Sequence, residues 1–298
     1  MYNKSDSRII IIGGSGLIGS SLNNVLFKDG FKVISTYTKN ALPNMVKFDF
    51  TKDKLSKISH KFNDRDIFII LSAYSNPSWI AENKDETYNL NVRSTINLIN
   101  QISDIGAKIF FMSSVEIFDG SSEINLENTK PNPLNYYGET KLLVEKYLQE
   151  KCKNYHILRT GWNVGINLKS RCVITLTYKT LLNNGAKMAT DNTFTITHVD
   201  DLTNIISKIL FSNDKDILHL CSPEIISRNK LAEFVIQMSK KGKRMKYKEV
   251  LFSDIFYNEP RAKLNNLRSK YDDFNNIKLF RKTKETVKEK VNFLDKAI

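Results

Sequence analysis

A tyrosine and a lysine four positions apart are the residues of this chain best suited to acid–base chemistry. Tyr137 and Lys141 fall on a helix predicted over residues 135–151, so their side chains share one face. A phenol has a pKa of about 10, and a neighbouring ammonium group lowers that pKa by favouring phenolate. Ser114, at the end of a predicted strand, is placed to orient a substrate oxygen. We therefore predict that these three residues form a catalytic set for proton transfer.

A glycine-rich turn near the N-terminus is suited to holding a dinucleotide. Gly13, Gly16 and Gly19 follow the apolar run 9–12 and open a helix predicted over residues 17–29. Residues without a Cβ let the backbone turn tightly and approach a pyrophosphate, whose charge is favoured by the N–H groups at the start of a helix. Because the turn joins a strand to a helix and precedes the catalytic set, the sequence predicts nicotinamide-dependent redox chemistry.

The end of the second predicted strand bears on which nicotinamide cofactor binds. An NAD site usually has an acidic residue there, which bonds to the 2′-hydroxyl of the adenosine ribose. Here Tyr37, Thr38 and Lys39 offer no carboxylate, so a 2′-phosphate is not repelled, and we expect NADPH to be preferred over NADH. Asp49, at the end of the next strand, is a candidate acceptor for the adenine amino group and an equally good candidate for a loop cap.

Strands alternate with helices through the first half of the chain. This alternation is typical of an α/β protein with a Rossmann-type, doubly wound parallel sheet, in which ligands bind beyond the carboxyl ends of the strands. Apolar runs predict strands at 9–12, 32–37, 46–50, 66–71, 108–112 and 156–159, and helical spacing predicts helices at 17–29, 87–102 and 135–151.

Beyond residue 165 the alternation loosens, which indicates a smaller, mixed substrate-binding lobe. Residues 197–202 open another helix, 216–220 form one more strand, and an amphipathic helix covers 230–239. We interpret His198, which begins a His-Val-Asp-Asp stretch, as part of a helix cap and not as a catalytic group. The predicted domains are an NAD(P)-binding Rossmann domain over 1–168 with 193–222, and a substrate-binding lobe over 169–192 with 223–298.

The composition excludes several classes of protein. The chain carries a formal charge of +13, but its lysines are spread along all 298 residues without a nucleic-acid reader motif, so we expect no nucleic-acid partner. No apolar run approaches the roughly 18–20 residues that cross a bilayer, and no secretion signal opens the sequence, so we expect a cytoplasmic protein without a membrane partner. Cys152, Cys172 and Cys221 are odd in number and widely spaced, which favours reduced, buried thiols and no metal.

Several segments together resemble the extended short-chain dehydrogenase/reductases that modify nucleotide-activated sugars. Within that superfamily the chain is most similar to the dTDP-4-dehydrorhamnose reductase branch, because Pro-Leu-Asn-Tyr-Tyr-Gly-Glu-Thr-Lys at 133–141 is close to that branch's active-site helix start. Leu-Arg-Thr-Gly-Trp at 158–162 resembles its Arg-Thr-Ser-Trp, and Ile-Ser-Arg at 226–228 resembles the start of another of its helices. The remaining segments that carry the resemblance are 9–19, 71–73, 89–95, 111–114, 159–165 and 198–201.

The resemblance implies an NAD(P)H-dependent oxidoreductase that reduces a nucleotide-activated 4-keto-6-deoxy-sugar in the synthesis of surface-polysaccharide precursors. It also implies a nucleotide-diphosphate sugar as the substrate and a homodimer as the assembly. The predicted cofactor-binding residues are Gly13, Ser15, Gly16, Leu17, Ile18, Gly19, Tyr37, Thr38, Lys39, Asp49, Phe50, Leu71, Ser72, Ala73, Asn91, Tyr137, Lys141 and Thr160. The predicted substrate-binding residues are Ser75, Glu116, Trp162, Arg228 and Arg261.

Departures from the family pattern bear on the reaction. Val115 stands where the reductase branch tends to have Asp and where a 4,6-dehydratase has its acid, so dehydration in that form is not expected. Glu116 is either a candidate base for epimerisation or a solvated loop carboxylate. The pair Pro260-Arg261 only loosely matches the branch's Arg-Pro, which leaves the diphosphate contact open. Two alternatives to the reductase stay open: a nucleotide-sugar epimerase that retains its NAD(P), and a non-catalytic NADP-binding regulatory subunit.

Overall fold

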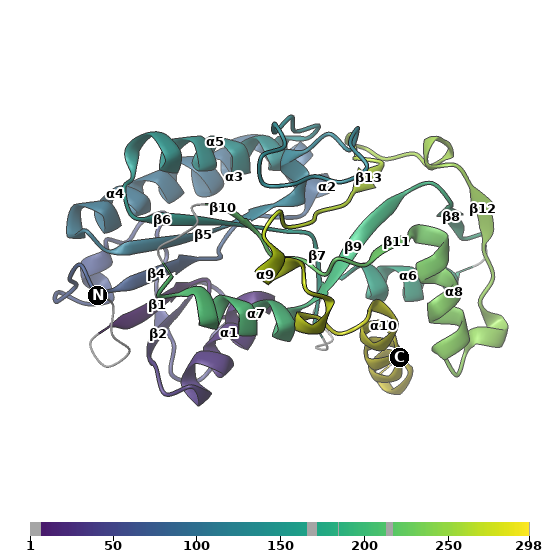
Figure 1. Cartoon of the computed structure of the whole chain (residues 1–298), viewed down its shortest axis with the longest axis horizontal. Coiled ribbons are helices and arrows are strands. Elements are labelled where there is room, and N and C mark those ends of the chain that lie inside the picture. The colour runs from purple at the N-terminus through teal and green to yellow at the C-terminus, as the bar shows by residue number, and fades with distance from the viewer. Residues whose placement is uncertain (1–6, 166–171, 184, 213–216, 298) are drawn as a thin grey trace. The chain divides into compact units, whose positions relative to one another are not determined.

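A computed structural model describes residues 7–165, 172–183, 185–212 and 217–297 of the chain (Figure 1). The chain divides into two units: the first comprises residues 1–117, 133–159 and 203–218, and the second comprises 118–132, 160–202 and 219–298. This division differs from the predicted domain boundaries. Residues 118–132, 160–165, 193–202 and 219–222, which were assigned to the Rossmann domain, belong to the second unit.

The first unit is built on a seven-stranded sheet with the order β10-β6-β5-β4-β1-β2-β3. Strand β1 pairs parallel with β2 and with β4, and β4 pairs parallel with β5, so the predicted Rossmann-type parallel sheet is confirmed. The strand order reverses between β1 and β4, and the carboxyl ends of strands at such a reversal are where doubly wound sheets bind their ligands. The strands are β1 (Arg8–Ile12), β2 (Lys32–Tyr37), β3 (Val46–Lys47), β4 (Ile67–Ile70), β5 (Lys108–Ser114), β6 (Tyr155–Thr160) and β10 (Ile217–His219).

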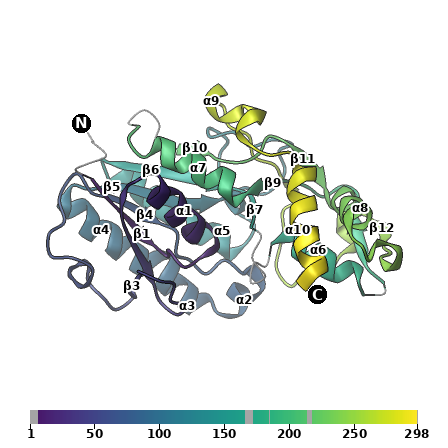
Figure 2. The ribbon, with the colours of Figure 1, turned by 90° about the horizontal axis from the view of Figure 1, so that it is seen from below.

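The centre of this sheet is buried on both faces, which is why its strands are continuous apolar runs. Residues 9–12 of β1 and all of β4 expose at most 1% of their surface. Helices α4 (Thr95–Ile105) and α5 (Tyr136–Lys151) lie over one face of the sheet, and α1 (Leu17–Lys28) and α7 (Val199–Ile209) lie over the other (Figures 1 and 2). The shorter helices of this unit are η1 (Leu55–Lys57), α2 (Pro77–Glu82), α3 (Lys84–Tyr88) and η3 (Val115–Ile117).

The helix predicted over residues 87–102 is interrupted. α3 and α4 are joined by η2 (Asn89–Ser94), a π-helical turn in which the hydrogen bonds span one residue more than in an α-helix. The Thr95 hydroxyl donates to the carbonyl oxygen of Leu90 (2.9 Å) within this turn. The predicted helix is therefore present but contains a π-helical turn, which the apolar spacing of the sequence does not indicate.

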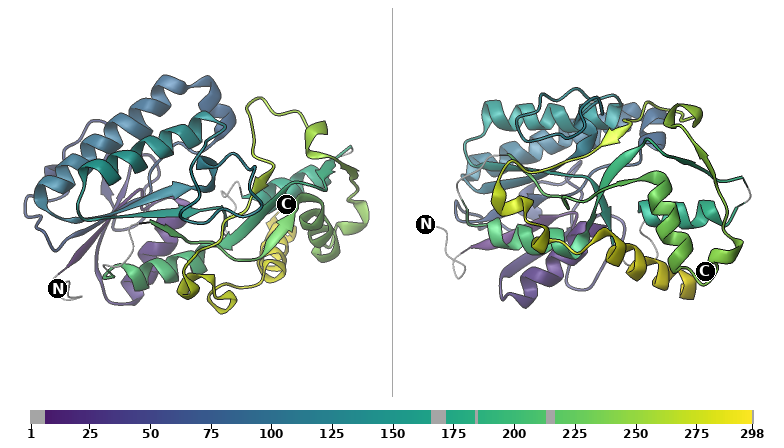
Figure 3. Two further views of the ribbon diagram at one scale, coloured as in Figure 1. Left: turned by 45° about the horizontal axis from the view of Figure 1, so that its top comes forward. Right: turned by 45° about the vertical axis from the view of Figure 1, so that its right-hand side comes forward.

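The second unit combines small sheets with three helices that share an apolar core (Figure 3). It is mixed α/β, as predicted for the smaller lobe. β9 (Thr193–His198) pairs with β11 (Ile225–Ser227), β13 (Leu264–Asn265) and β7 (Trp162–Val164), and β8 (Lys187–Ala189) pairs with β12 (Lys248–Val250). The helices of the core are α6 (Val173–Leu181), α8 (Arg228–Met238) and α10 (Thr283–Ala297), and the short helices are η4 (Gly242–Arg244), η5 (Phe252–Asp254), α9 (Asp272–Asn275) and η6 (Ile277–Leu279).

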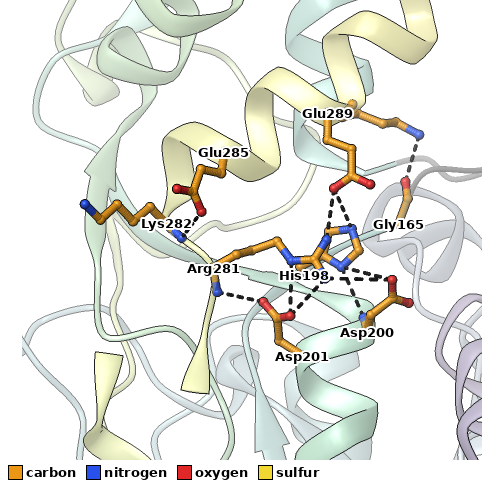
Figure 4. A network of polar contacts seen from close by, with 9 residues as sticks. Gly165, His198, Asp200, Asp201, Arg281, Lys282, Glu285 and Glu289 are labelled. Atoms are coloured by element: carbon orange, nitrogen blue, oxygen red, sulfur yellow. Dashed lines mark hydrogen bonds and ion pairs between the residues drawn. The ribbon is translucent and has the colours of Figure 1, made fainter. Parts of the chain in front are cut away.

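A polar network within the second unit joins the start of α7 to α10 (Figure 4). Arg281 donates through Nε to Asp201 (3.1 Å) and forms an ion pair with Glu289 (2.9 Å). The buried ring of His198 accepts the backbone N–H of Asp200 at Nδ1 (3.2 Å), and its Nε2 lies 3.7 Å from Glu289. This geometry agrees with the structural interpretation of His198 at the start of a helix.

We expect the protein to lose stability as the pH falls below about 6.5, the usual pKa of histidine. Burial, followed by the Arg281 guanidinium, lowers the pKa of His198 against the opposing effects of Asp200, Glu289 and Asp201. The unfolded chain therefore takes up this proton first, and the free energy of unfolding falls with pH by at most about 1.4 kcal/mol per unit. Thermal unfolding between about pH 5 and pH 8 should show a shallower dependence in His198→Gln; equal slopes would contradict the assignment.

Candidate active site

The glycine turn connects the end of β1 to the start of α1. The N–H of Gly16 donates to the carbonyl oxygen of Gly13 (3.1 Å), and the N–H of Ser20 donates to that of Gly16 (2.9 Å). Gly13 has a φ of 89°, a left-handed conformation that favours glycine, and its N–H donates to Thr36 Oγ1 on β2 (3.2 Å). Sequence reasoning missed Thr36, because no local pattern marks a strand threonine that ties two segments together.

The space around each glycine separates those that pack the fold from one that faces outward. A Cβ on Gly19 would come within 2.7 Å of Gly14 Cα, and a Cβ on Gly13 within 2.9 Å of Ser72 N. Gly16 is exposed, and a Cβ there would meet only the carbonyl oxygen of Gly13 at 3.3 Å. Gly16 also precedes a helix whose first turn has no side-chain cap and no acidic residue. The turn therefore fits the pyrophosphate of a dinucleotide, with Ser15, Leu17 and Ile18 beside it.

The residues predicted to face the adenosine lie beyond β2 and β3. Thr38 and Lys39 are exposed, and the Thr38 hydroxyl donates to the Phe48 carbonyl oxygen (3.3 Å). Asp49 Oδ1 accepts from both the N–H and the hydroxyl of Thr51 (3.1 and 2.7 Å), so this carboxylate is a loop cap. Its role as an acceptor for adenine stays a proposal, as do those of Tyr37 and of Phe50, which is buried beside it.

Asn91 holds the segment that follows β4, where Leu71, Ser72, Ala73 and Ser75 lie. Its Oδ1 accepts the N–H of Tyr74 (2.9 Å), and its Nδ2 donates to the Tyr74 carbonyl oxygen (2.9 Å) and to Thr140 Oγ1 on α5 (3.3 Å). Both ends of the buried amide are therefore used within the protein. The π turn carries Asn91, so this turn positions the segment after β4 against the helix of the catalytic set.

Ser114, Tyr137 and Lys141 come together in the first unit. Ser114 ends β5, and its hydroxyl acts on the phenol of Tyr137, in the first turn of α5, so as to lower the pKa of that phenol. Lys141 is buried one turn further along, where its Nζ donates to the carbonyl oxygen of Met112 (2.9 Å) and lies 5.9 Å from the centroid of the Tyr137 ring. The structure thus brings the three predicted catalytic side chains to the carboxyl end of one strand.

The electrostatics of this set differ from the expectation for the phenol. Burial raises the pKa of Tyr137 well above its usual value, and the negative charge of Glu116 raises it further. Only the Ser114 hydroxyl acts in the opposite direction. Burial lowers the pKa of Lys141 to about 8, with Glu145 opposing. The predicted lowering of the phenol pKa was wrong for the protein alone, because the Lys141 ammonium is directed to a backbone carbonyl and burial disfavours the charged form of both groups.

Glu116 and Asn135 frame the start of α5. Asn135 is the N-cap, with Oδ1 accepting the N–H of Gly138 (3.0 Å), and its Nδ2 donates to Glu116 Oε2 (2.7 Å). The Glu116 N–H donates to Ser114 Oγ (3.2 Å). Glu116 is therefore half-buried and bonded to the N-cap of α5 through one carboxylate oxygen, and its role stays a proposal. Asn135 was missed as a functional residue, although an asparagine directly before a helix is a recognisable cap signal.

The other predicted residues lie in the second unit. The Arg228 guanidinium stacks over the rings of Trp162 (5.3 Å) and Phe194 (5.0 Å). Burial lowers the pKa of Arg228, Tyr257 opposes this effect, and the like charge of Arg261 adds to it. Thr160 donates from its hydroxyl to Asn163 Oδ1 (3.0 Å). The structure therefore groups Trp162 with Arg228, and it pairs Arg261 with Glu259 and places it over the ring of Tyr257.

The described ranges contain no candidate metal site and no candidate membrane-spanning helix. No cluster of three or more His, Cys, Asp and Glu side chains within them is arranged to hold a metal ion, and none of their helices is both long and apolar enough to span a bilayer. The three cysteines are free; Cys172 and Cys221 are buried as expected, and Cys152 is half-buried. Burial raises the pKa of the Cys221 thiol to about 12, which keeps it protonated and unreactive.

A family model described as the RmlD substrate binding domain matches residues 7–278 of the chain. The chain belongs to this family. Its expected membership of the extended short-chain dehydrogenase/reductases, on the dTDP-4-dehydrorhamnose reductase branch, is therefore confirmed. Among curated relatives, the chain is 27% identical over 158 residues to the methionine adenosyltransferase 2 subunit beta of Bos taurus, which covers 53% of this chain and 47% of that protein. The chain thus spans about half the length of the curated relatives it matches.

Solved structures share the fold over almost the whole chain. A dTDP-4-dehydrorhamnose reductase from Clostridium acetobutylicum has a TM-score of 0.81 and 23% identity, and the match covers 96% of this chain and 99% of that one. The dTDP-4-dehydrorhamnose reductase of Bacillus anthracis, solved in complex with NADP, has a TM-score of 0.77 and 21% identity, with 97% and 99% covered. At these identities the likeness establishes the fold.

We expect Gly16→Val to abolish binding of NADPH while the protein stays folded. The new side chain would project from the exposed side of the turn, where the pyrophosphate is expected, and it would meet only one backbone oxygen of the protein. Gly19→Val is the matched control, because its side chain would collide with the backbone of Gly14 and cost stability, about 1–3 kcal/mol for overpacking. Fluorescence titration and thermal unfolding separate the two effects, and unchanged affinity in Gly16→Val would exclude the turn as the phosphate site.

Proposed function

We propose that the protein is an NAD(P)H-dependent reductase of a nucleotide-activated 4-keto-6-deoxy-sugar, acting in the synthesis of surface-polysaccharide precursors. The observation that carries the proposal is the grouping of Ser114, Tyr137 and Lys141: the Ser114 hydroxyl acts on the phenol of Tyr137, and Lys141 is buried one turn along the same helix with its Nζ 5.9 Å from the centroid of the Tyr137 ring. Membership of the RmlD family and the shared fold of two dTDP-4-dehydrorhamnose reductases support it. The cytoplasmic location, the homodimer and the absence of nucleic-acid or membrane partners remain part of this proposal.

In this proposal the chain's own residues manage the proton and the carbonyl oxygen. The bound cofactor supplies the hydride that reduces the carbonyl carbon of the sugar. Tyr137 donates its phenolic proton to the oxygen as that oxygen gains negative charge, and Ser114 holds the oxygen by a hydrogen bond. A raised pKa suits this role, because it keeps Tyr137 protonated before a reduction begins. Lys141 would bind the nicotinamide ribose and stabilise the phenolate that remains.

NADPH is the cofactor we propose. The end of β2 carries Tyr37, Thr38 and Lys39 without a carboxylate, and Lys39 is exposed where it can meet a 2′-phosphate. The NADP complex of the Bacillus anthracis reductase supports a site of this kind on this fold.

The second unit offers groups suited to a diphosphate. Among the described residues no carboxylate is paired with Arg228, whose guanidinium lies over the rings of Trp162 and Phe194 and whose pKa is lowered by burial. A phosphate would stabilise this charge through short, bidentate hydrogen bonds. Trp162 and Arg261 complete the proposed substrate-binding residues of this unit.

Two other functions have specific support. The curated relatives named methionine adenosyltransferase 2 subunit beta favour a non-catalytic, NADP-binding subunit of another enzyme. A nucleotide-sugar epimerase that retains its NAD(P) would use the same Tyr137 in both directions. The complete set of Ser114, Tyr137 and Lys141 favours catalysis over a purely regulatory role.

We expect Tyr137→Phe to lower kcat for reduction of a nucleotide 4-keto-sugar by about 10²–10⁴-fold, the usual contribution of general acid catalysis. NADPH affinity should stay within a few-fold, because the phenol acts only where charge develops on the substrate oxygen. Tyr136→Phe is the matched control, because it removes the hydroxyl of the neighbouring tyrosine. The Tyr136 ring lies outside the catalytic set, with its centroid 5.4 Å from Lys84 Nζ. NADPH oxidation is followed by absorbance against a panel of such sugars.

A different set of results would contradict the reductase function. If the native protein binds NADPH, oxidises it with no sugar of the panel, and Tyr137→Phe alters only the association with a partner protein, the regulatory subunit takes the reductase's place. Interconversion of sugar epimers without net consumption of NADPH would instead favour the epimerase.

We expect Lys39→Asp to reduce NADPH affinity at least tenfold and to leave NADH affinity within a few-fold, because a carboxylate at the end of β2 repels only the cofactor that carries the 2′-phosphate. Lys151→Asp, in the last turn of α5, is the control for the same change in net charge. Both cofactors are titrated by fluorescence at one ionic strength. A native preference for NADH would remove the argument from Tyr37 and Lys39.

A further inference from the structure

Glu116 is the charged group that bears most directly on the phenol of Tyr137. It lies in η3, two residues after Ser114, and its carboxylate reaches the N-cap of α5. We propose that Glu116 is a positioning residue for the proton donor: acting through Asn135, it holds the first turn of α5 and keeps the proton on Tyr137 between turnovers. This inference rests on the proposed function only in naming Tyr137 as the donor.

The Asn135 amide transmits the position of Glu116 to the helix. A carboxylate can only accept hydrogen bonds, so Glu116 must face the NH₂ group of the amide (Nδ2···Oε2 2.7 Å). The amide oxygen is thereby turned toward α5, where it accepts the N–H of Gly138 (3.0 Å). Tyr137 lies between the cap and Gly138, in the turn that this bond closes. Glu116 therefore decides which end of Asn135 caps the helix.

Backbone packing holds the same two elements together. A Cβ on Gly138 would come within 2.8 Å of the carbonyl carbon of Glu116, so only glycine lets the first turn of α5 lie directly against η3. Glu116 is also bonded through its N–H to Ser114 Oγ, the partner of Tyr137. The Glu116 carboxylate and the Tyr137 phenol therefore belong to two elements that pack directly against each other, so these two groups have little freedom to separate.

The charged and polar groups that act on Tyr137 come from three elements. Glu116 of η3 raises the pKa of the phenol in addition to the effect of burial, and the Ser114 hydroxyl of β5 lowers it. Lys141 of α5 is directed to the carbonyl oxygen of Met112. Glu139, also in the first turn of α5, acts on the neighbouring Tyr136. A negative charge beside the phenol penalises phenolate, so Glu116 favours the protonated form that a reductase needs.

The test separates charge from geometry. Glu116→Gln keeps an oxygen that can accept from Asn135 but removes the charge, and Glu116→Ala removes both. Glu139→Gln neutralises a carboxylate of the same helical turn and is the matched control. The ionisation of Tyr137 is followed by NMR of protein labelled with 13C at tyrosine Cζ, with and without NADP⁺, and its signal is assigned by its absence in Tyr137→Phe.

We expect Tyr137 to ionise at a clearly lower pH in Glu116→Gln than in the native protein or Glu139→Gln, because the nearby negative charge that penalises phenolate has been removed. Glu116→Ala should show the same shift and also a melting temperature lower by several degrees, because the cap loses its orientation. If the reductase assay succeeds, the high-pH limit of kcat/KM should move down by the same amount.

Coincident titrations of the native protein and Glu116→Gln overturn the proposal, including the case in which both phenols stay protonated up to about pH 11. A uniform loss of kcat at every pH with an unmoved limit would overturn it as well, since that is the result of structural damage alone. The titration of the protein without NADP⁺ needs neither cofactor nor sugar, so failure of the reductase function leaves this test intact.

Discussion

Direct backbone packing between the glycine turn and the start of α1 is the constraint on which the rest of the site depends. Gly19 allows no Cβ against Gly14, so α1 begins immediately over the carboxyl end of β1. Its first-turn N–H groups are left without a side-chain cap, at the point where the strand order of the sheet reverses. The segment after β4 and the end of β5 reach this same edge, because parallel strands all end there. The proposed phosphate site and the predicted catalytic set are therefore neighbours by topology.

Burial sets the electrostatic state of the catalytic set. Both Tyr137 and Lys141 are shifted toward their neutral forms, the phenol by a raised pKa and the ammonium by a pKa lowered to about 8. Burial is the main cause of both pKa shifts. The charged form of each group is stabilised when a ligand supplies polar contacts in place of water. A site in this state favours ligands that bring hydroxyl groups and negative charge with them. Binding and protonation at Lys141 are consequently linked.

Much of the first unit could be predicted from the sequence because its signals are local. The run 9–12, the glycine turn and the helix from Tyr136 to Lys151 are each readable in a short window, and the structure reproduces them. The π turn at Asn89–Ser94 and the direction of the Tyr137 pKa could not be predicted, since each depends on side chains distant in the sequence. In the second unit, β9 was missed because its buried Thr193–His198 run alternates Thr with apolar residues and resembles the polar segment before it.

The π turn has a consequence for how this chain can vary in evolution. One residue more than a regular helix requires is accommodated between α3 and α4, and Asn91 reaches Tyr74 and Thr140 from within it. Deleting one residue there would replace the π-helical turn by an ordinary α-helical turn, whose hydrogen bonds span one residue fewer. Such a deletion would shorten the chain without disturbing either helix, yet it would withdraw the amide that supports the active site. Length changes in this stretch should therefore be purged by selection even where substitutions are tolerated.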